Sequence, residues 1–458
     1  MVDSTGAKSL YAYIVEPDST SGYNCRKIRQ GTETLTNYSN ATTIFQDISD
    51  FLSTVGGGRV GIRNGLYLID GSEIYIPGEG VQNALLQWGN PAAATNPVDI
   101  ILEGETREGV IIRNTYTPPS LETDFFGAFC SLELRNITLD NDALGSLSGG
   151  TAVNILRARE GTDGKRILRA NNCEFIDHTG YGFRVPSNRV ITPSFLGSEA
   201  TNSIFRRTCT GDDMCSCHPD GWGKTIGNYF DTRVAGVSSD GQCITGGTSI
   251  NMQISHNVIE RSPEDIRNGI SLEPFSGNCK NVLIHDNIVN YGIVKVGQDT
   301  WAGTAKNILI CDNIVTGGQI RLKGPTSGDY STELMHGVIK GNTLIDSPQY
   351  GIRVNNTAGI CEVRNNLVIN SNGELDGGTN NSCIHLDHCL NMICENNTIY
   401  MGLTNPPDVK FSPAGIKYTF MVSSKIQGNR IFNLTTTPNP NYVNGGGHSG
   451  TNIFSHNT

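Results

Sequence analysis

Two neighbouring stretches of the chain decide its fold. Residues 281–296 read NVLIHDNIVNYGIVKV, and residues 307–322 read NILICDNIVTGGQIRL. Both contain an alternating apolar run, an acidic residue with asparagine, an apolar pair, and a second alternating run after glycine. Alternating apolar residues are typical of short β-strands, while Gly and Asn between them indicate turns. Each stretch therefore predicts three short strands with tight corners, and the pattern repeats after 26 residues.

The asparagine before the apolar pair recurs along most of the chain at intervals of 24 to 32 residues. Its members are Asn172, Asn202, Asn228, Asn257, Asn287, Asn313, Asn342, Asn366, Asn397 and Asn429, with Asn136 as a plausible earlier one. Such a period, without room for a crossover helix, predicts a parallel β-solenoid whose coils stack at about 4.8 Å. We expect each Asn to adopt the left-handed conformation and to hydrogen-bond to the equivalent Asn in adjacent coils.

The stretch that precedes the first coil predicts one amphipathic helix over residues 43–55. Its apolar residues form one stripe, Thr43 and Gln46 have the spacing of a capping box, and three glycines at 56–58 follow. Strands are expected at 59–62 and 66–69. A helix at this position would cover the open end of the solenoid and block its exposed strand edges.

Composition excludes several classes of protein. The chain has 458 residues, with 34 Lys+Arg, 44 Asp+Glu, a net charge of −10, 54 Gly and 45 Asn. An acidic balance without a basic cluster argues against nucleic acid as a partner, and no apolar run of about 18 residues indicates a membrane span. The N-terminus lacks the features of a signal peptide. The 13 scattered cysteines predict a mixture of buried thiols and a few disulfides.

The segment 41–105, with its helix, GGG and RVGIRNGLYLI, resembles the N-terminal part of pectate-lyase-superfamily β-helices. The Asn-marked coils of residues 130–433 resemble the same superfamily. The resemblance implies an all-β protein, a single-stranded right-handed parallel β-helix with an N-terminal capping helix. It divides the chain into a leading segment 1–40, the β-helix 41–435 and a polar C-terminal tail 436–458. Pectate lyases, polygalacturonases, uronan epimerases and viral tailspikes share this fold, so fold alone does not assign an activity.

Residues that point outward from stacked strands should form rows spaced about 4.8 Å apart, which can match the units of a polymer. The glycine-led strands place a largely cationic series outside: Arg184, Glu273 with Ser271, Lys295, Arg321 with Lys323, Arg353, His385 with Asp387, and Lys417. Lys and Arg at these positions suit carboxylates or sulfates on a sugar chain. The alternative is that they keep a β-surface soluble.

Acidic residues concentrate earlier, in the stretch 209–224. It contains Asp213, His218 and Asp220, and Asp240 follows one coil later. The sequence His-Pro-Asp-Gly at 218–221 looks like the Asn-Thr-Asp-Gly coil of polygalacturonases, and the Asp240 segment is similar to their Gly-Asp-Asp-Cys-Ile coil. However, the second segment has one Asp rather than two, and no Gly-His-Gly or Arg-Ile-Lys follows. The two-carboxylate inverting mechanism is therefore in doubt.

β-Elimination on a uronan needs the uronate carboxylate neutralised, by Ca²⁺ or by Arg and Lys, and a base for the C5 proton. The catalytic candidates are Asp213, His218, Asp220, Asp240, Glu273 and Lys295. Substrate-binding candidates are Trp222, Lys224, Trp301, Arg321, Lys323, Arg353 and His385. The alternative for each Trp is a packing role that holds a loop in place. Asp213, Asp220 and Asp240 are candidate Ca²⁺ ligands, although no pectate-lyase Ca²⁺ signature is recognisable.

Zinc is a further alternative, at Cys209, Cys215, Cys217 and His218, or at Cys383, His385, His388 and Cys389. Neither spacing matches an established zinc site, so disulfides or buried thiols are favoured at both places.

The leading hypothesis is an enzyme that depolymerises an extracellular, uronic-acid-containing polysaccharide, by β-elimination rather than hydrolysis. The alternative is a non-catalytic glycan-binding protein of a surface or virion, which resemblance to tailspikes would make a trimer. A third interpretation is a scaffold without a carbohydrate role. In the first two hypotheses the partner is an anionic polysaccharide and the location is extracellular, cell-surface or virion.

Overall fold

The structure of the chain is a computed structural model. The described residues are 13–18, 22–29, 32–70, 83–89, 98–116, 123–141, 153–158, 166–176, 181–185, 195–206, 215–219, 221–233, 242–247, 249–263, 267–273, 278–297, 304–324, 336–348, 350–371, 382–401, 414–433, 442–444, 446 and 451–455. They form two compact units, Met1–Gly241 and Gln242–Thr458.

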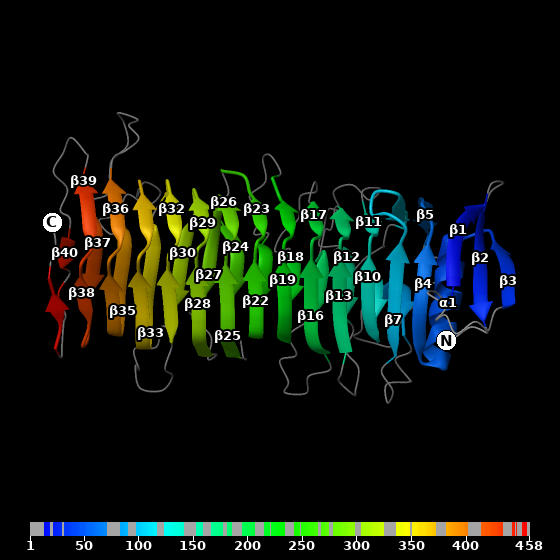
Figure 1. Cartoon of the computed structure of the whole chain (residues 1–458), viewed down its shortest axis with the longest axis horizontal. Helices are drawn as coiled ribbons and strands as arrows, with labels where there is room; N and C mark the ends of the chain where they lie inside the picture. Colours follow the sequence, from blue (N-terminus) through cyan, green and yellow to red (C-terminus); the bar gives the residue numbers. More distant parts are fainter. Residues whose placement is uncertain are drawn as a thin grey trace. The chain divides into compact units, whose positions relative to one another are not determined.

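Unit 1 is built from coils whose strands fall into three parallel stacks, named here A, B and C (Figure 1). Stack A contains β4 (Gly57–Ile62), β7 (Asp99–Gly104), β10 (Ser131–Arg135), β13 (Arg166–Asn171), β16 (Phe195–Thr201) and β19 (Gly221–Ile226). Stack B contains β5 (Gly65–Ile69), β8 (Val110–Asn114), β11 (Thr138–Asp140), β14 (Glu174–Ile176), β17 (Ile204–Arg206) and β20 (Tyr229–Asp231). Stack C contains β6 (Asn83–Trp88), β9 (Thr123–Ala128), β12 (Val153–Ala158), β15 (Phe183–Val185) and β18 (Cys215–Pro219).

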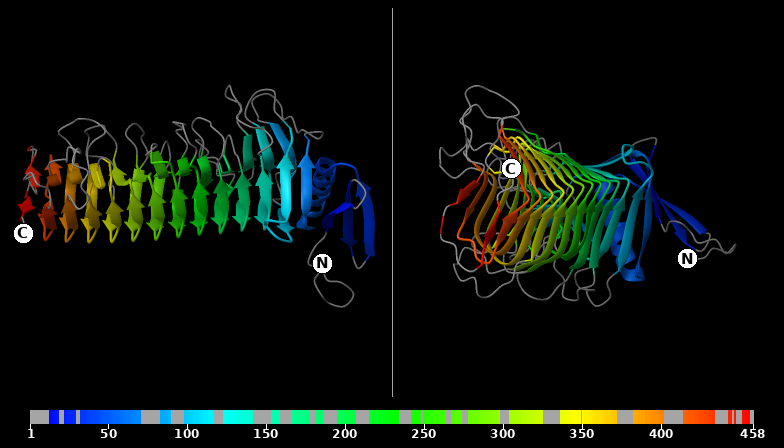
Figure 2. Two further views of the ribbon diagram at one scale, coloured as in Figure 1. Left: turned by 90° about the horizontal axis from the view of Figure 1, so that it is seen from above. Right: turned by 60° about the vertical axis from the view of Figure 1, so that its left-hand side comes forward.

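Unit 2 repeats the three stacks, and Figure 2 shows its strands recurring coil after coil in green to red. Stack A contains β22 (Ser249–Ser255), β25 (Asn278–His285), β28 (Thr304–Cys311), β31 (Gly337–Lys340), β38 (Lys425–Gln427) and β41 (Ile453–Phe454). Stack B contains β23 (Val258–Glu260), β26 (Ile288–Asn290), β29 (Ile314–Thr316), β32 (Thr343–Ile345), β34 (Leu367–Ile369), β36 (Thr398–Met401) and β39 (Arg430–Asn433). Stack C contains β21 (Gln242–Gly246), β24 (Arg267–Leu272), β27 (Gly292–Val296), β30 (Gln319–Lys323), β37 (Ala414–Thr419) and β40 (Tyr442–Asn444). The long strands β33 (Ile352–Arg364) and β35 (Ser382–Glu395) begin in stack C and continue into stack A.

The parallel pairing of successive coils makes the fold a right-handed parallel β-helix, as the sequence pattern predicts. The core follows from the alternation of side chains along each strand, because every second residue points into the coil. Phe175, Phe205 and Phe230 illustrate this in unit 1: they occupy the middle of successive stack B strands, and their rings are stacked at 4.8 and 4.7 Å. Identical residues thus lie above one another and fill the core in columns.

The beginning of unit 1 is closed by antiparallel strands and one helix. Strands β1 (Tyr13–Asp18), β2 (Gly22–Arg29) and β3 (Thr32–Tyr38) form an antiparallel meander, and β1 also pairs in parallel with β4. Helix α1 (Ala41–Val55) packs with Ile44, Phe45, Ile48 and Leu52 buried, and the Phe45 ring meets the Trp88 ring at 6.4 Å. The predicted helix is present.

The predicted capping box at Thr43 and Gln46 is wrong. The helix begins two residues earlier, and its N-cap is Asn40, whose side chain accepts the backbone N–H of Thr42 at 2.6 Å. The Gln46 amide instead donates to Asp50 and to the backbone carbonyl of Gln87. Gly56 ends the helix with a left-handed φ of 87°, where an L-residue with a side chain would be strained.

Asparagine side chains connect consecutive coils at the corner between stacks A and B. In unit 2, the Asn313 amide donates to Asn342 Oδ1 at 2.9 Å, and the Asn342 amide donates to Asn366 Oδ1 at 3.0 Å. The prediction that these asparagines are left-handed is wrong for unit 2. The positive φ belongs to the residue before each of them, such as Asp312 with a φ of 57°. The buried Asn is therefore free to satisfy backbone carbonyls inside the corner.

The corner differs in the earlier coils of unit 1. There Asn136, Asn172 and Asn202 themselves have the left-handed φ, and Asn172 donates to Asn136 Oδ1 at 2.8 Å. The buried position is taken by the next residue, such as Cys173 and Ser203. The repeat in the sequence thus combines two adjacent structural positions.

Three further expectations concern the whole chain. Every cysteine whose side chain is described is buried, which agrees with the expected buried thiols, and no disulfide joins two of these described residues. The polar segment 436–458, expected as a tail, contains β40 and β41, which pair with β37 and β38. None of the helices in the described part has the length and apolar character needed to cross a bilayer.

Candidate functional site: a cationic face on stack C of unit 2

The outward side chains of stack C in unit 2 form one predominantly cationic surface. Its rows are set by the strand register, which pairs Ser271 with Lys295, Lys295 with Arg321, Arg321 with Arg353, Arg353 with His385, and His385 with Lys417. A second row two residues further along carries Lys323, Asn355, Asp387 and Thr419 in register. We call Lys295, Arg321, Lys323, Arg353, His385 and Lys417 the cationic face. The predicted row is therefore present from Lys295 to Lys417 in unit 2, whereas Arg184 lies on β15 (Phe183–Val185) of unit 1.

Alternation along the strands explains why these polar residues share one side. On β30, Ile320 and Leu322 are buried on either side of Arg321, and on β33 Ile352 and Val354 are buried on either side of Arg353. The apolar partners fill the coil and hold the polar residues on the opposite side of the pleat. A one-residue slip would bury the charges, so the core itself maintains the register of the face.

One end of the cationic face carries a compact ion pair. Lys295 Nζ donates to Glu273 Oε1 at 2.7 Å, and the Ser271 hydroxyl donates to the same oxygen at 2.8 Å. The side chains of Lys295 and Glu273 are only 17% and 8% exposed. Both residues were predicted to be catalytic, and the structure brings them together. Because Glu273 accepts two hydrogen bonds, it positions the ammonium of Lys295 at the edge of the face.

The middle of the face concentrates like charge. Burial, and then the neighbouring charge of Arg353, lowers the pKa of Arg321 to about 10. Burial, followed by the charges of Arg353 and Lys295, lowers the pKa of Lys323 to about 8. Arg321 Nε donates to Gln319 Oε1 at 2.8 Å, which fixes its orientation. An anion placed here would relieve the mutual repulsion of these cations.

Arg353 and His385 form the next part of the face, together with Tyr350. The Arg353 guanidinium lies 5.1 Å from the Tyr350 ring centre, and the Tyr350 and His385 rings are 4.9 Å apart. Burial and the charges of Arg353 and then Lys417 lower the pKa of His385 to about 4, against the opposite effect of Asp387. His385 is therefore neutral at pH 7.

Two buried nitrogens of this group have unused hydrogen-bonding capacity. Within the part of the chain that the structure describes, neither Arg353 Nε nor His385 Nδ1 has a hydrogen-bond partner. Buried polar groups are normally satisfied by protein or ordered water, so these two nitrogens are an unusual feature of the cationic face.

The far end of the face carries an acidic residue that is already engaged. Asp387 Oδ1 lies 2.8 Å from His388 Nδ1 and also accepts the hydroxyl of Thr419. The His388 ring stacks on Phe420 with centres 4.2 Å apart. Burial lowers the pKa of Lys417, whereas Asp387 raises it. The charges at this end are thus partly compensated.

Sequence reasoning missed Tyr350, although a signal was present. The sequence Tyr-Gly-x-Arg occurs at Tyr181–Arg184 and again at Tyr350–Arg353. In both copies the guanidinium lies over the tyrosine ring, at 4.0 Å for Arg184 and 5.1 Å for Arg353. The repeat of this motif identifies an aromatic support for an outward arginine.

The structure does not describe the side chains of several predicted site residues. Asp213, Asp220, Asp240 and Trp301 fall outside the described residues, and His218 lies on β18, where its side chain is not described. The acidic cluster and its Ca²⁺ therefore stay predictions.

Trp222 and Lys224 lie on β19 of stack A, whereas His218 is on stack C of the same unit. The half-buried indole of Trp222 lies over Gly197 in the preceding coil, where any Cβ would come within 2.7 Å of it. This contact supports the alternative in which the tryptophan has a packing role.

The two zinc alternatives have different outcomes. Cys209 lies outside the described residues, which leaves the first untested. At the second, Cys383 and Cys389 are buried and contact the backbone carbonyls of Ser371 and Val354. Among the described residues these two cysteines do not converge with His385 and His388 into a metal-binding group.

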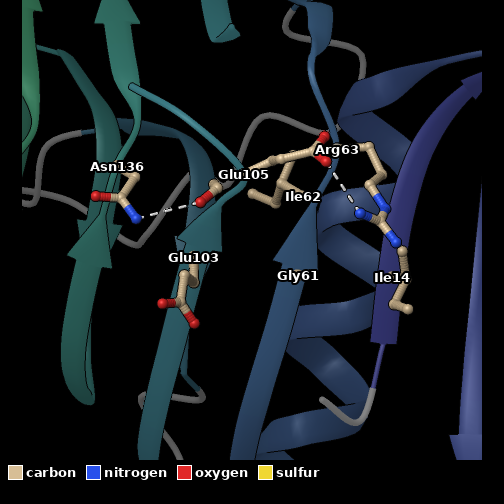
Figure 3. A pocket seen from close by; sticks show the side chains of 8 residues that line it. Ile14, Gly61, Ile62, Arg63, Glu103, Glu105 and Asn136 are labelled. Carbon is tan, nitrogen blue, oxygen red and sulfur yellow. Dashed lines mark hydrogen bonds and ion pairs between the residues drawn. The ribbon is translucent and has the colours of Figure 1, made fainter. Parts of the chain in front are cut away.

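A separate hollow of about 290 Å³ lies in unit 1, at the corner between stacks A and B (Figure 3). Arg63, Glu105 and Asn136 line it, and Arg63 Nη1 donates to Glu105 Oε1 at 3.1 Å. Both charged side chains are about half exposed, so the pair contributes little to stability. Nothing in its lining resembles the cationic face.

Comparisons with known proteins return structures of low sequence identity. No protein family profile and no curated protein matches the sequence. The A-module of an Azotobacter vinelandii mannuronan C-5 epimerase is 15% identical, with a TM-score of 0.43, over 90% of this chain and 96% of that one. The Yersinia enterocolitica family 28 exopolygalacturonase is 11% identical, with a TM-score of 0.45, over 94% and 82%. The Dettilon tailspike protein is 14% identical, with a TM-score of 0.45, over 86% and 65%.

Proposed function

We propose that the cationic face binds an acidic, uronic-acid-containing polysaccharide, and that the chain cleaves it by β-elimination. The observation that carries this proposal is the in-register row of Lys295, Arg321, Arg353 and Lys417 in a chain whose net charge is −10. Clustered cations create a local positive potential that attracts an anionic partner even when the chain as a whole is acidic.

The spacing of the row suits a polymer. Adjacent strands lie about 4.8 Å apart, so the cations present a regular series that an extended chain of carboxylates can follow. Arginine offers paired N–H donors that match a carboxylate. Arg353 Nε and His385 Nδ1 have no hydrogen-bond partner among the described residues, and the Tyr350 ring lies against both side chains.

The middle of the face has the groups that elimination requires. Neutralisation of a uronate carboxylate by Arg321 and Arg353 would make the C5 proton more acidic. Lys323, whose pKa is lowered to about 8, has an uncharged amine fraction at neutral pH that can accept this proton. As the C5–H bond breaks, a double bond forms between C4 and C5, and the C4–O bond breaks. The leaving oxygen takes up a proton, so the products are one unsaturated and one saturated chain end.

Hydrolysis by the carboxylates of this face is less consistent with its dimensions. Glu273 and Asp387 are separated by four inter-strand steps, about 19 Å at about 4.8 Å each. Paired carboxylates of glycosidases lie about 5 to 9.5 Å apart. These two residues therefore do not form an acid and base pair across one glycosidic bond.

Metal assistance is a separate part of the proposal. Asp213, Asp220 and Asp240 remain the candidates for Ca²⁺, since carboxylates are its preferred ligands. Product formation that stops on addition of a chelator and returns with Ca²⁺ would support this part, whereas unchanged activity would contradict it.

The experiment is incubation of the purified chain with polygalacturonate, alginate and glucuronan, with and without Ca²⁺. Elimination yields an unsaturated product that absorbs in the ultraviolet, whereas hydrolysis yields new reducing ends without that absorbance. Reducing ends without ultraviolet absorbance would overturn elimination. The absence of both products and of binding from the whole panel would overturn the proposal.

A non-catalytic glycan-binding protein is the second candidate. It is favoured by the engagement of both carboxylates on the face, Glu273 with Lys295 and Asp387 with His388. Binding without turnover, from an oligomer at a cell or virion surface, would identify it. Lys323→Met separates the candidates, because loss of the amine that accepts the C5 proton should abolish turnover in an enzyme but only weaken binding in an attachment protein.

A further inference from the structure

A second polar cluster lies in unit 2 on the corner between stacks A and B, away from the strands of the cationic face. It contains His256, which follows β22, and His285 and Asp286, which end and follow β25. His256 and Asp286 hold the same position in consecutive coils and have left-handed φ angles of 57° and 53°. The stacking of coils therefore brings two imidazoles and one carboxylate to one place.

The distances within this cluster approach those of a metal site. His285 Nδ1 lies 2.6 Å from Asp286 Oδ2, and His256 Nε2 lies 3.9 Å from the same oxygen. One ligand atom from each residue lies within 4.8 Å of the others. Two ligands bound to Zn²⁺ at about 2.0–2.1 Å in tetrahedral geometry are about 3.4 Å apart. Both separations thus lie within about 0.8 Å of the required value.

Small side-chain movements can close the remaining difference. The side chains of His256 and Asp286 are 60% and 48% exposed, so each can rotate, whereas that of His285 is only 17% exposed. The backbone beneath them is held in place, because Asn257 Nδ2 donates to Asn287 Oδ1 at 2.9 Å directly after His256 and Asp286. The corner therefore combines a fixed backbone with two adjustable ligands.

Gln253 on β22 supplies an outer contact of the kind that metal-bound histidines usually have. Its Nε2 lies 3.0 Å from His285 Nε2, while His285 Nδ1 faces Asp286. If His285 binds a metal through Nδ1, its Nε2 carries the proton and Gln253 can present its oxygen by rotating the amide. Such a contact orients the imidazole ring and strengthens it as a ligand.

We propose that His256, His285 and Asp286 bind one zinc ion at the surface of unit 2. Two imidazoles and one carboxylate favour Zn²⁺ or a related first-row divalent ion over Ca²⁺ and Mg²⁺, which prefer oxygen ligands alone. Three protein ligands leave a fourth position open to water or another donor. Within the described part of the chain, no other group of three such side chains meets.

The structure offers a matched control in His388 and Asp387. They repeat the pairing of an imidazole with an adjacent carboxylate, at 2.8 Å, but lack a second imidazole. His388 should therefore contribute nothing to zinc affinity, although it is a partly exposed histidine paired with aspartate in the same unit.

The test is titration of the whole chain with ZnCl₂ in competition with a chromophoric chelator. We expect one tight site in the wild-type chain. The variants His256→Ala, His285→Ala and Asp286→Asn should each weaken it at least tenfold to a hundredfold, Gln253→Ala about tenfold, and His388→Ala not at all. Co²⁺ should give the visible absorption of a four-coordinate ion in the wild-type chain but not in His256→Ala.

Circular dichroism of each variant checks that it folds. Zinc bound equally by wild type and by folded His256→Ala and His285→Ala would overturn the proposal, as would the absence of a tight site in the wild-type chain. Asp286→Asn preserves the shape of the side chain and keeps the test decisive if an alanine variant fails to fold.

Discussion

Arg353 lies directly beside Arg321 in the neighbouring strand of stack C, and both guanidiniums are on the outer side of the coil. Like charges in directly opposite positions of a sheet are destabilising. The chain nevertheless places Lys323 next to this pair, and burial with the nearby cations lowers the pKa of Lys323 to about 8. This arrangement is unfavourable in the free protein, and an anion bound between these side chains would offset the repulsion.

Replacement of Arg353 should weaken binding of an acidic polysaccharide without destabilising the fold. Arg353→Gln removes a charged donor worth about 1.5–3 kcal/mol, so affinity should fall about tenfold or more. The midpoint of thermal unfolding should stay constant or rise, because the repulsion with Arg321 is removed. Affinity is measured by calorimetry. The control is Lys306→Gln, which replaces an exposed cation on β28 of stack A. An equal loss of affinity in both variants would contradict a role of the cationic face in binding.

Binding should weaken as pH rises through the pKa of Lys323. This pKa is about 8 in the folded protein against an ordinary 10.5, so below pH 8 the amine is charged and above it the amine is neutral. A polyanion binds the charged form of Lys323 more tightly than the neutral form. At pH 9 binding therefore requires the Lys323 amine to take up a proton, and affinity falls by up to about tenfold per pH unit. Calorimetry in two buffers of different ionisation enthalpy measures the proton uptake. Lys323→Arg stays charged and should lose this pH dependence; a retained dependence would assign it to another group.

The pair Glu273–Lys295 should be costly to break but tolerant of complete replacement. Glu273→Gln leaves the largely buried ammonium of Lys295 without its carboxylate and should lower the free energy of unfolding by about 3 kcal/mol. The double variant Glu273→Gln with Lys295→Met removes both charges and should recover much of this loss. Urea denaturation of both single variants and the double variant measures the coupling. Additive losses would show that the two side chains do not interact.

The asparagine corner should be a major source of stability. Asn342 is fully buried, and its amide donates to the backbone carbonyls of Ile310 and Lys340 and to Asn366 Oδ1. Asn342→Ala removes these bonds and leaves buried carbonyls unsatisfied, so it should cost about 3 kcal/mol or more. Asn290→Ala is the control, since its half-buried amide donates to Glu260 and its loss should cost about 1 kcal/mol. Similar losses of stability in both variants would contradict a special contribution of the asparagine corner.

Much of the architecture could be predicted from the sequence because the repeat is local. The period of 24 to 32 residues and the alternation around Arg321 and Arg353 indicate which side chains point outward, and the register confirms it. The conformation of the corner could not be predicted in the same way. Asp312 has the left-handed φ, not Asn313, because the buried amide must face inward to bond with Asn342.

The sequence by itself determined the coils, the cationic row and its order, since one side chain per coil follows directly from alternation and period. Only the tertiary structure decided what surrounds each charge. Glu273 and Lys295 are 22 residues apart but meet in a bond of 2.7 Å, and Tyr350 supports Arg353 and His385 together. The tertiary structure also brings His256 of one coil close to His285 and Asp286 of the next coil. Such contacts depend on burial and on distances between coils, and these arise only when each coil is stacked on the next.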